Sequence, residues 1–285
     1  MKWSYRLGTF FGIGVDVHVT FLLLLAYVAW SSYSASSSWL VASVGVLFVL
    51  ALFLFVVMHE YGHALTARHF GIRTRRITLY PIGGMAMLEG MPRSPRQQLL
   101  VALAGPAVNF VLAALIGALM LAIGADVSMG AIFGERSSGL LSSLLYVNLL
   151  MGAFNLIPAL PMDGGRVLRA FLEMRMGPVR ATDIAARVAR VLAFGMGIFA
   201  LMDPQQPILF AIALMVWFMA GVERFQTRQL EAMRARGQID PYGLTGSSPT
   251  GQVPRARPPS AYGGRHEVVE VVDGPNGPTV RIIRS

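Results

Sequence analysis

Six apolar segments dominate the hydrophobic pattern of this 285-residue chain, and polar stretches separate them. A helix needs about 20 apolar residues to cross a bilayer, and each segment reaches or approaches that length. The predicted spans are residues 17–30, 39–58, 99–123, 140–157, 188–202 and 207–222. The pattern therefore predicts an all-α polytopic membrane protein with six transmembrane helices.

The segment between the second and third spans departs from this helical pattern. Residues 77–88 are too apolar for a plain loop, and β-forming side chains flank Gly83 and Gly84 at their centre. Such a segment is typical of a short hairpin or a re-entrant, β-like loop that enters the protein. An interfacial loop without a function is the alternative that the pattern leaves open.

Composition and charge agree with a membrane protein. Hydrophobic residues make up 54% of the chain and charged residues only 14%, whereas soluble domains carry about a quarter charged residues. The net charge is +9, but the arginines are concentrated in alternate polar segments, and the loops at 34–38, 124–139 and 203–206 hold only Arg136. The positive-inside rule then places both termini in the cytoplasm. It also accounts for the charge without a nucleic-acid partner.

The composition changes after Glu223, which predicts two regions: a membrane core at residues 1–223 and a cytoplasmic tail at 224–285. Residues 237–264 are rich in Gly, Pro, Ser and Arg, so we expect most of the tail to be disordered. Two valine- and isoleucine-rich runs, 268–272 and 280–283, predict a small terminal β-hairpin.

The strongest chemical signal lies at the end of the second span, where His59, Glu60 and His63 occur together. Positions i and i+4 share one face of a helix, so the two imidazoles can bind one zinc ion. Glu60 then lies beside the metal, where its carboxylate can take a proton from a water that zinc activates. The chain has no cysteine, so any other metal ligand must be His, Asp or Glu.

Asp163 is the best candidate for a third ligand, because zinc hydrolases use three protein ligands. It follows the fourth span, which ends on the same predicted side of the membrane as the second. Pro158 and Pro161 break the helix before it and free backbone polar groups, which are tolerated at such depth only where they line a cavity within the protein.

These motifs together resemble the site-2 protease family of intramembrane zinc metalloproteases. The resemblance rests on the motif at 59–63, on residues 155–164 (Asn-x-x-Pro-x-x-Pro-x-Asp-Gly), on 104–109 and on the Gly83-Gly84 loop. It implies one Zn²⁺ per chain held by His59, His63 and Asp163, with Glu60 as general base. It also implies cleavage of a membrane-spanning protein substrate near the cytoplasmic face. A bacterial member, in the inner membrane, would typically cut a membrane-tethered anti-sigma factor.

Three further residues receive weaker assignments. Gly83 and Gly84 are expected to present a strand edge to an unwound substrate, and Asn155 either orients substrate or makes a structural hydrogen bond. Asn109 is interpreted as a helix-packing residue.

The main alternative function is a catalytically inert zinc-binding membrane chaperone or scaffold, and the intact Glu60 favours the enzyme. A metal transporter is a second alternative, but the sequence shows no internal repeat.

Overall fold

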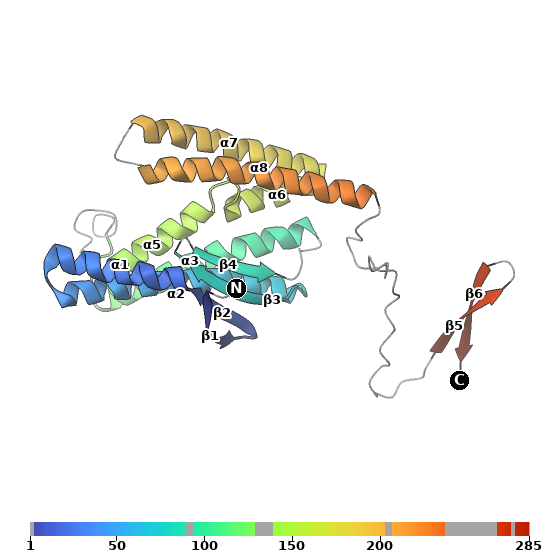
Figure 1. The fold of residues 1–285 in the computed structure, drawn as a ribbon, viewed down its shortest axis with the longest axis horizontal. Helices are drawn as coiled ribbons and strands as arrows, with labels where there is room; N and C mark the ends of the chain where they lie inside the picture. Colours follow the sequence, from blue (N-terminus) through green and yellow to red (C-terminus); the bar gives the residue numbers. More distant parts are fainter. Residues whose placement is uncertain are drawn as a thin grey trace. The chain divides into compact units, whose positions relative to one another are not determined.

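The computed structural model describes residues 3–81, 83–88, 94–128, 139–202, 207–236, 267–274 and 277–284. The chain divides into two units, Met1–Ile239 and Asp240–Ser285. Most of the described residues of the first unit are helical, as the sequence predicts (Figure 1). Its helices are α1 (Val19–Ser36), α2 (Trp39–His69), α3 (Pro95–Ala122), α5 (Leu140–Asn155), α6 (Asp163–Met176), α7 (Pro178–Met202) and α8 (Pro207–Ala235).

Five of these helices, α1, α2, α3, α7 and α8, are long and apolar enough to cross a membrane. Many of their large apolar side chains face outward, as in a protein surrounded by lipid. The predicted fourth span corresponds to α5, which is apolar but has only 16 residues, about 24 Å of helix. The count of six spans therefore stays a prediction.

The all-α description was wrong, because a four-stranded sheet accompanies the helices. Its strands are β1 (Ser4–Phe10), β2 (Ile13–His18), β3 (Thr74–Tyr80) and β4 (Gly83–Leu88), in the order β1-β2-β3-β4. The segment predicted as a hairpin or re-entrant loop forms β3 and β4, which pair antiparallel. Strand β2 pairs parallel with β3, which lies about sixty residues later in the sequence. Because this partner is so distant, the local sequence pattern did not predict the N-terminal strands.

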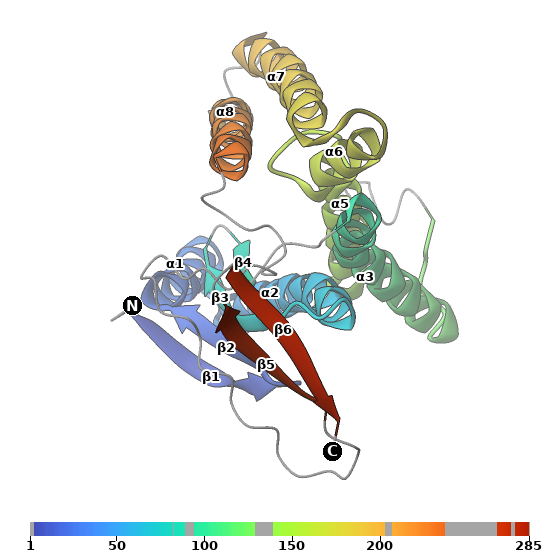
Figure 2. The same cartoon turned by 90° about the vertical axis from the view of Figure 1, so that its right-hand side faces the viewer.

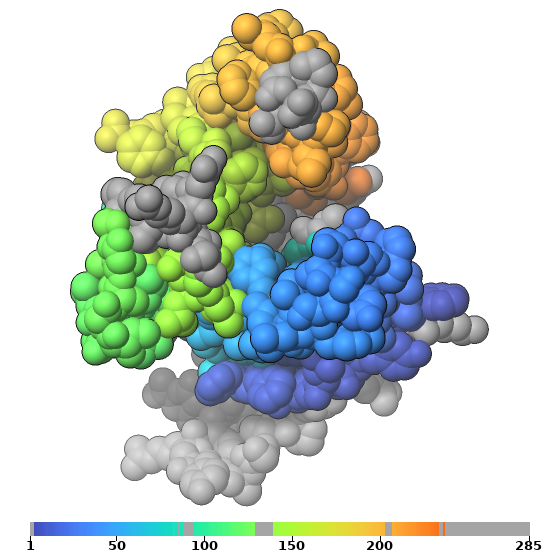
Figure 3. All heavy atoms as spheres, turned by 90° about the vertical axis from the view of Figure 1, so that its left-hand side faces the viewer, coloured from blue at the N-terminus to red at the C-terminus, as the bar shows by residue number. Residues whose placement is uncertain are grey.

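Strands β1 and β2 lie on the side of α1 and α2 that faces away from α7 and α8 (Figure 2), and β3 and β4 contact α2. In the space-filling view, β1 and β2 (dark blue) follow the flank of α1 and α2, while α7 and α8 (yellow to orange) form a separate pair (Figure 3). Helix α6 packs against both α3 and α7, and it connects this pair to the rest of the unit. Arg169 strengthens the connection, since it bonds Gln98 of α3 at 3.0 Å and contacts Glu223 of α8 at 3.5 Å.

Close contact between α2 and α3 sets the geometry around His59 and His63 of α2. A Cβ atom added to Gly62 of α2 would lie 2.6 Å from the carbonyl oxygen of Ala104 on α3. Real Cβ atoms do not approach backbone oxygens so closely, so the two helices can touch here only because position 62 is glycine. The histidines on either side of Gly62 are thereby brought directly against α3.

The second unit contains a β-hairpin formed by β5 (Glu267–Gly274) and β6 (Gly277–Arg284). The strands pair antiparallel, with Val269 opposite Ile282, which matches the two predicted apolar runs. Residues 237–264, predicted to be disordered, lie outside the described part of the chain. Helix α8 runs past residue 223 to Ala235, so the proposed division of the chain at 223 and 224 falls within a helix.

Candidate metal centre

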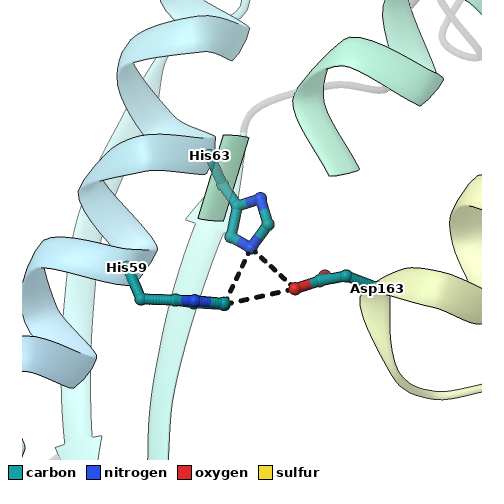
Figure 4. Close-up of side chains that lie close together, drawn as sticks. All are labelled: His59, His63 and Asp163. Atoms are coloured by element: carbon teal, nitrogen blue, oxygen red, sulfur yellow. Dashed lines mark hydrogen bonds and ion pairs between the residues drawn. The ribbon is translucent and has the colours of Figure 1, made fainter. Parts of the chain in front are cut away.

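Helix α2 places the two histidines of the motif together. His59 and His63 are both buried, and their Nε2 atoms lie 3.1 Å apart with the rings nearly perpendicular. This arrangement follows from the i, i+4 spacing, which stacks the side chains one turn apart on the same face. The two nitrogens therefore point at one common position (Figure 4).

Asp163 completes the group from the first turn of α6. Its Oδ2 atom lies 3.2 Å from the Nε2 of His59 and 3.1 Å from that of His63 (Figure 4). The turn before it is compact, because a Cβ on Gly164 would come within 2.2 Å of the Leu156 carbonyl oxygen. Glycine at 164 therefore lets α6 begin against the end of α5 and fixes where the carboxylate lies.

The three atoms fit a zinc ion. Ligand atoms at about 2.0–2.1 Å from a tetrahedral metal lie about 3.3 Å from one another, close to the separations found here. The group is buried and consists of two imidazole nitrogens and one carboxylate oxygen, a donor set typical of catalytic zinc. A Cβ on Gly105 of α3 would lie 2.2 Å from the His63 Nε2 atom and 2.8 Å from the His59 Cε1 atom. Glycine thus keeps open the space in front of the two Nε2 atoms that could bind a metal.

The other nitrogen of each imidazole is held by α3. The His59 Nδ1 lies 3.1 Å from Asn109 Oδ1, and the His63 Nδ1 lies 2.7 Å from the Val101 carbonyl oxygen. Both oxygens can only accept, so each Nδ1 carries the proton and each Nε2 presents its lone pair to a metal. Asn109 was interpreted from the sequence as a packing residue. An amide side chain within an apolar helix was the available sequence signal for a larger role, and the structure shows it to be fully buried.

The electrostatic environment of Asp163 also favours metal binding. Burial alone would raise the pKa of its carboxyl group, but in the metal-free site imidazolium protons on the Nε2 atoms of His59 and His63 can bond to the carboxylate and hold that pKa well below its usual range. A metal ion would take the place of these Nε2 protons. Its position in the first turn of α6 adds the favourable end of the helix dipole. The carboxylate is therefore ionised at neutral pH, as a metal ligand must be.

Of the remaining predicted residues, Glu60 lies against Gly84 of β4, whereas Asn155 lies at the end of α5. Glu60 follows His59 on α2, and β4 passes directly beside it: a Cβ on Gly84 would lie 2.9 Å from the Glu60 Cγ atom. Gly83 begins β4 with φ +135°. Asn155, at the end of α5, donates its amide to the Met151 carbonyl oxygen at 3.0 Å. Within the described part of the chain, no hydrogen bond joins Asn155 to the three ligands.

Comparison with known proteins places the chain in a family. The model of peptidase family M50 matches residues 47–136 and 122–196, which together exceed half of the chain. A zinc metalloprotease of Methanocaldococcus jannaschii is 38% identical over 226 residues, which cover 78% of this chain and 61% of that protein. Rip3 of Mycobacterium tuberculosis is 36% identical over 208 residues, covering 68% of this chain and 50% of its own length. The chain thus spans between half and about three fifths of these relatives.

A solved structure agrees with the sequence comparison. The site-2 protease from Methanocaldococcus jannaschii superposes with a TM-score of 0.54 at 36% identity, over 78% of this chain and 95% of that one. Together with the five apolar helices, this match indicates a multi-pass membrane protein. The chain belongs to peptidase family M50, the family of the site-2 proteases.

Proposed function

We propose that this chain is an intramembrane zinc metalloendopeptidase that cuts membrane-spanning segments of tethered proteins. The observation that carries the proposal is the buried convergence of His59, His63 and Asp163 between helices with apolar outer faces. Buried polar groups are costly inside a bilayer, so three of them meeting at metal-ligand separations favour a functional site over an accident of packing.

The proposed ligands are the Nε2 atoms of His59 and His63 and the Oδ2 atom of Asp163. Bound zinc would supply an acidic water and a Lewis acid for the scissile carbonyl group. Asn109 and the Val101 carbonyl would hold the imidazoles in the tautomer that leaves Nε2 free. The role of the protein at these positions is to orient the ligands before any substrate arrives.

Glu60 is the proposed general base. Its position next to His59, and one turn before His63, places the carboxylate beside the ligand set. Glu60 would take a proton from the attacking water and pass it to the leaving amine nitrogen as the peptide bond breaks. A site that only binds zinc needs no such base, so this residue separates the enzyme from an inert chaperone or scaffold.

Gly83 and Gly84 are proposed to position the substrate. Among the described residues, β4 is the last strand of the sheet, so one side of its backbone has no partner strand there. An unwound substrate could pair with this edge by β-addition, and the contact of Gly84 with Glu60 would bring its backbone to the base. Glycine is needed at 84 because a larger side chain would occupy the space next to Glu60. Asn155 as a substrate-positioning residue stays a prediction.

The wider setting of the enzyme is proposed on the same basis. The arginine distribution supports six spans, with α5 as the fourth, and both termini in the cytoplasm. A bacterial inner membrane, and a membrane-tethered anti-sigma factor as substrate, remain our predictions for this chain. The lipid bilayer is then the medium in which both enzyme and substrate reside.

The decisive experiment compares the wild type with Glu60→Gln and a matched control, Glu231→Gln on α8. The full chain is purified, its zinc content is measured, and cleavage of a single-span model substrate is followed in vesicles. We expect Glu60→Gln to retain about one zinc while cleavage falls by about 10²–10⁴-fold, and the control to behave as wild type. Undiminished cleavage by Glu60→Gln would refute the role of the base. Zinc binding without proteolysis in the wild type would favour the scaffold.

A further inference from the structure

An apolar groove runs along α2 on the side of the β1–β2 hairpin, and it extends around α2 to Met58, Gly62 and Val108 of α3. It has a volume of about 620 Å³ and lies between α2 and the hairpin formed by β1 and β2. Tyr61 lies two residues from both His59 and His63, which is about 200° around the helix from each. The residues of α2 on this face include Leu50, Leu54, Val57, Tyr61 and Leu65, and Leu7 and Phe10 contribute from β1.

A basic pocket adjoins the groove near the end of α2. Its volume is about 380 Å³, and it is lined by Arg68, Arg73, Thr74, Arg75 and the tip of the β1–β2 hairpin. The three arginines are exposed, and none of the described residues that line the pocket is acidic. Phe11 lines both cavities, so the charged pocket and the apolar groove meet at this residue.

The junction is held in an unusual conformation. Phe11 has φ +51° and Gly12 has φ +78°, a left-handed turn that a bulky residue rarely adopts. Arg68 fixes the turn by donating to the Phe11 carbonyl oxygen at 2.7 Å, and the Tyr61 hydroxyl donates to the Phe10 carbonyl oxygen at 3.1 Å. Phe11, at the tip of this turn, is 72% exposed.

We propose that this composite cavity binds one anionic phospholipid. The phosphate of the headgroup would contact Arg68 and Arg73, which can donate charge-assisted hydrogen bonds to it, and an acyl chain would lie along the groove. The groove follows α2 from residue 50 to 65, about 22 Å, which is long enough for a chain that crosses one leaflet of about 15 Å. Charge complementarity selects an anionic lipid, because three arginines line the headgroup end.

The bound lipid would join the hairpin to α2. At present the two are connected by the bonds of Arg68 and Tyr61 and by the contact of the Phe11 and Tyr61 rings, whose centroids are 6.2 Å apart. A ligand that contacts both elements stabilises the folded state in proportion to its occupancy. The inference does not depend on the peptidase activity, since neither the three proposed ligands nor Glu60 line the groove or the basic pocket.

The test measures lipid binding by the purified full chain in detergent. Native mass spectrometry counts retained lipids, and thermal unfolding is followed during titration with dioleoyl phosphatidylglycerol, dioleoyl phosphatidylcholine or inorganic phosphate. We expect phosphatidylglycerol to raise the Tm by several degrees with one lipid retained, and the other two probes to have little effect. The variant Arg68→Gln/Arg73→Gln should weaken phosphatidylglycerol binding at least tenfold. The control Arg175→Gln/Arg180→Gln, on exposed residues outside the pocket, should not.

Two further variants keep the proposal falsifiable if loss of Arg68 disturbs the hairpin. Arg73→Gln alone should still weaken binding severalfold, and Leu54→Trp should fill the groove and reduce lipid retention, whereas Leu115→Trp on α3 should not. Equal Tm shifts from both lipids, the same shift from inorganic phosphate, or an equal loss in the control pair would overturn the proposal. Displacement of the lipid by a transmembrane substrate peptide would also overturn it, since the groove would then belong to the substrate. Glu60→Gln should leave lipid binding unchanged.

Discussion

Gly105→Ala should strongly weaken zinc binding although position 105 supplies no ligand. The added Cβ would lie 2.2 Å from the His63 Nε2 atom, more than 1 Å inside ordinary contact distance. The His63 ring cannot simply rotate away, because its Nδ1 is bonded to the Val101 carbonyl oxygen on the same helix α3 at 2.7 Å. Metal–ligand distances tolerate changes of only about 0.2 Å, so a ring displaced by 1 Å is lost as a ligand.

We expect the zinc affinity of Gly105→Ala to fall at least about 100-fold, which corresponds to about 2.8 kcal/mol. Overpacking of this kind costs about 1–3 kcal/mol, so the protein can relieve the clash by giving up the metal rather than by unfolding. Competitive titration with a zinc chelator measures the affinity. Gly117→Ala is the matched control, since it lies on α3 and its Cβ would meet nothing within 4 Å. Wild-type zinc affinity in Gly105→Ala would show that the space before the imidazoles is not the metal position.

Other contacts of the metal centre and of the sheet can be tested by substitution or by removal of zinc. Asn109→Leu should lower zinc affinity about 10–100-fold through the loss of its bond to His59, whereas Asn148→Leu, equally buried, should not; chelator titration compares the two. Removal of zinc with a chelator should lower the Tm of the wild type but leave the Tm of Asp163→Asn nearly unchanged. An equal fall in both would argue that zinc does not stabilise the fold by connecting Asp163 of α6 with the histidines of α2. Asp16→Asn should destabilise the sheet by about 1–3 kcal/mol, because the buried carboxylate accepts from Arg6 at 3.0 Å; unchanged unfolding would contradict this.

The parts of the site that were predictable carry their information locally. The spacing of His59 and His63 fixes their shared face whatever the rest of the chain does. Asp163 could be inferred because two prolines mark the helix break before it and because it follows a span ending on the same predicted side. The apolar runs likewise identified the long helices, although α7 begins at Pro178 rather than near 188, because its first turns carry arginines that masked the periodicity.

The parts that were missed depend on contacts between distant segments. Strand β1 exposes Tyr5, Leu7 and Phe10 and carries a bulge after Arg6, so it lacks the alternation that announces a half-buried strand. Strand β2 is buried from Ile13 to Val17 and pairs with β3, which follows α1 and α2 in the sequence. No hydrophobic pattern within residues 4–18 could have predicted a partner that lies beyond two long helices.

The contribution of helix α3 to the metal centre likewise depends on contacts between distant segments. It supplies no ligand, yet its glycine at 105 provides the space for the imidazoles, and its Val101 carbonyl and Asn109 side chain fix their tautomers. A helix rich in small residues could be read as membrane packing alone, because glycine permits close helix contact in either case. The opposing helix α2 distinguishes helix packing from a role in the metal centre. Gly62 of α2 brings the two backbones together, and the histidines on either side of it then need space on α3 for their rings. The function of Gly105 is therefore set by residues more than forty positions away.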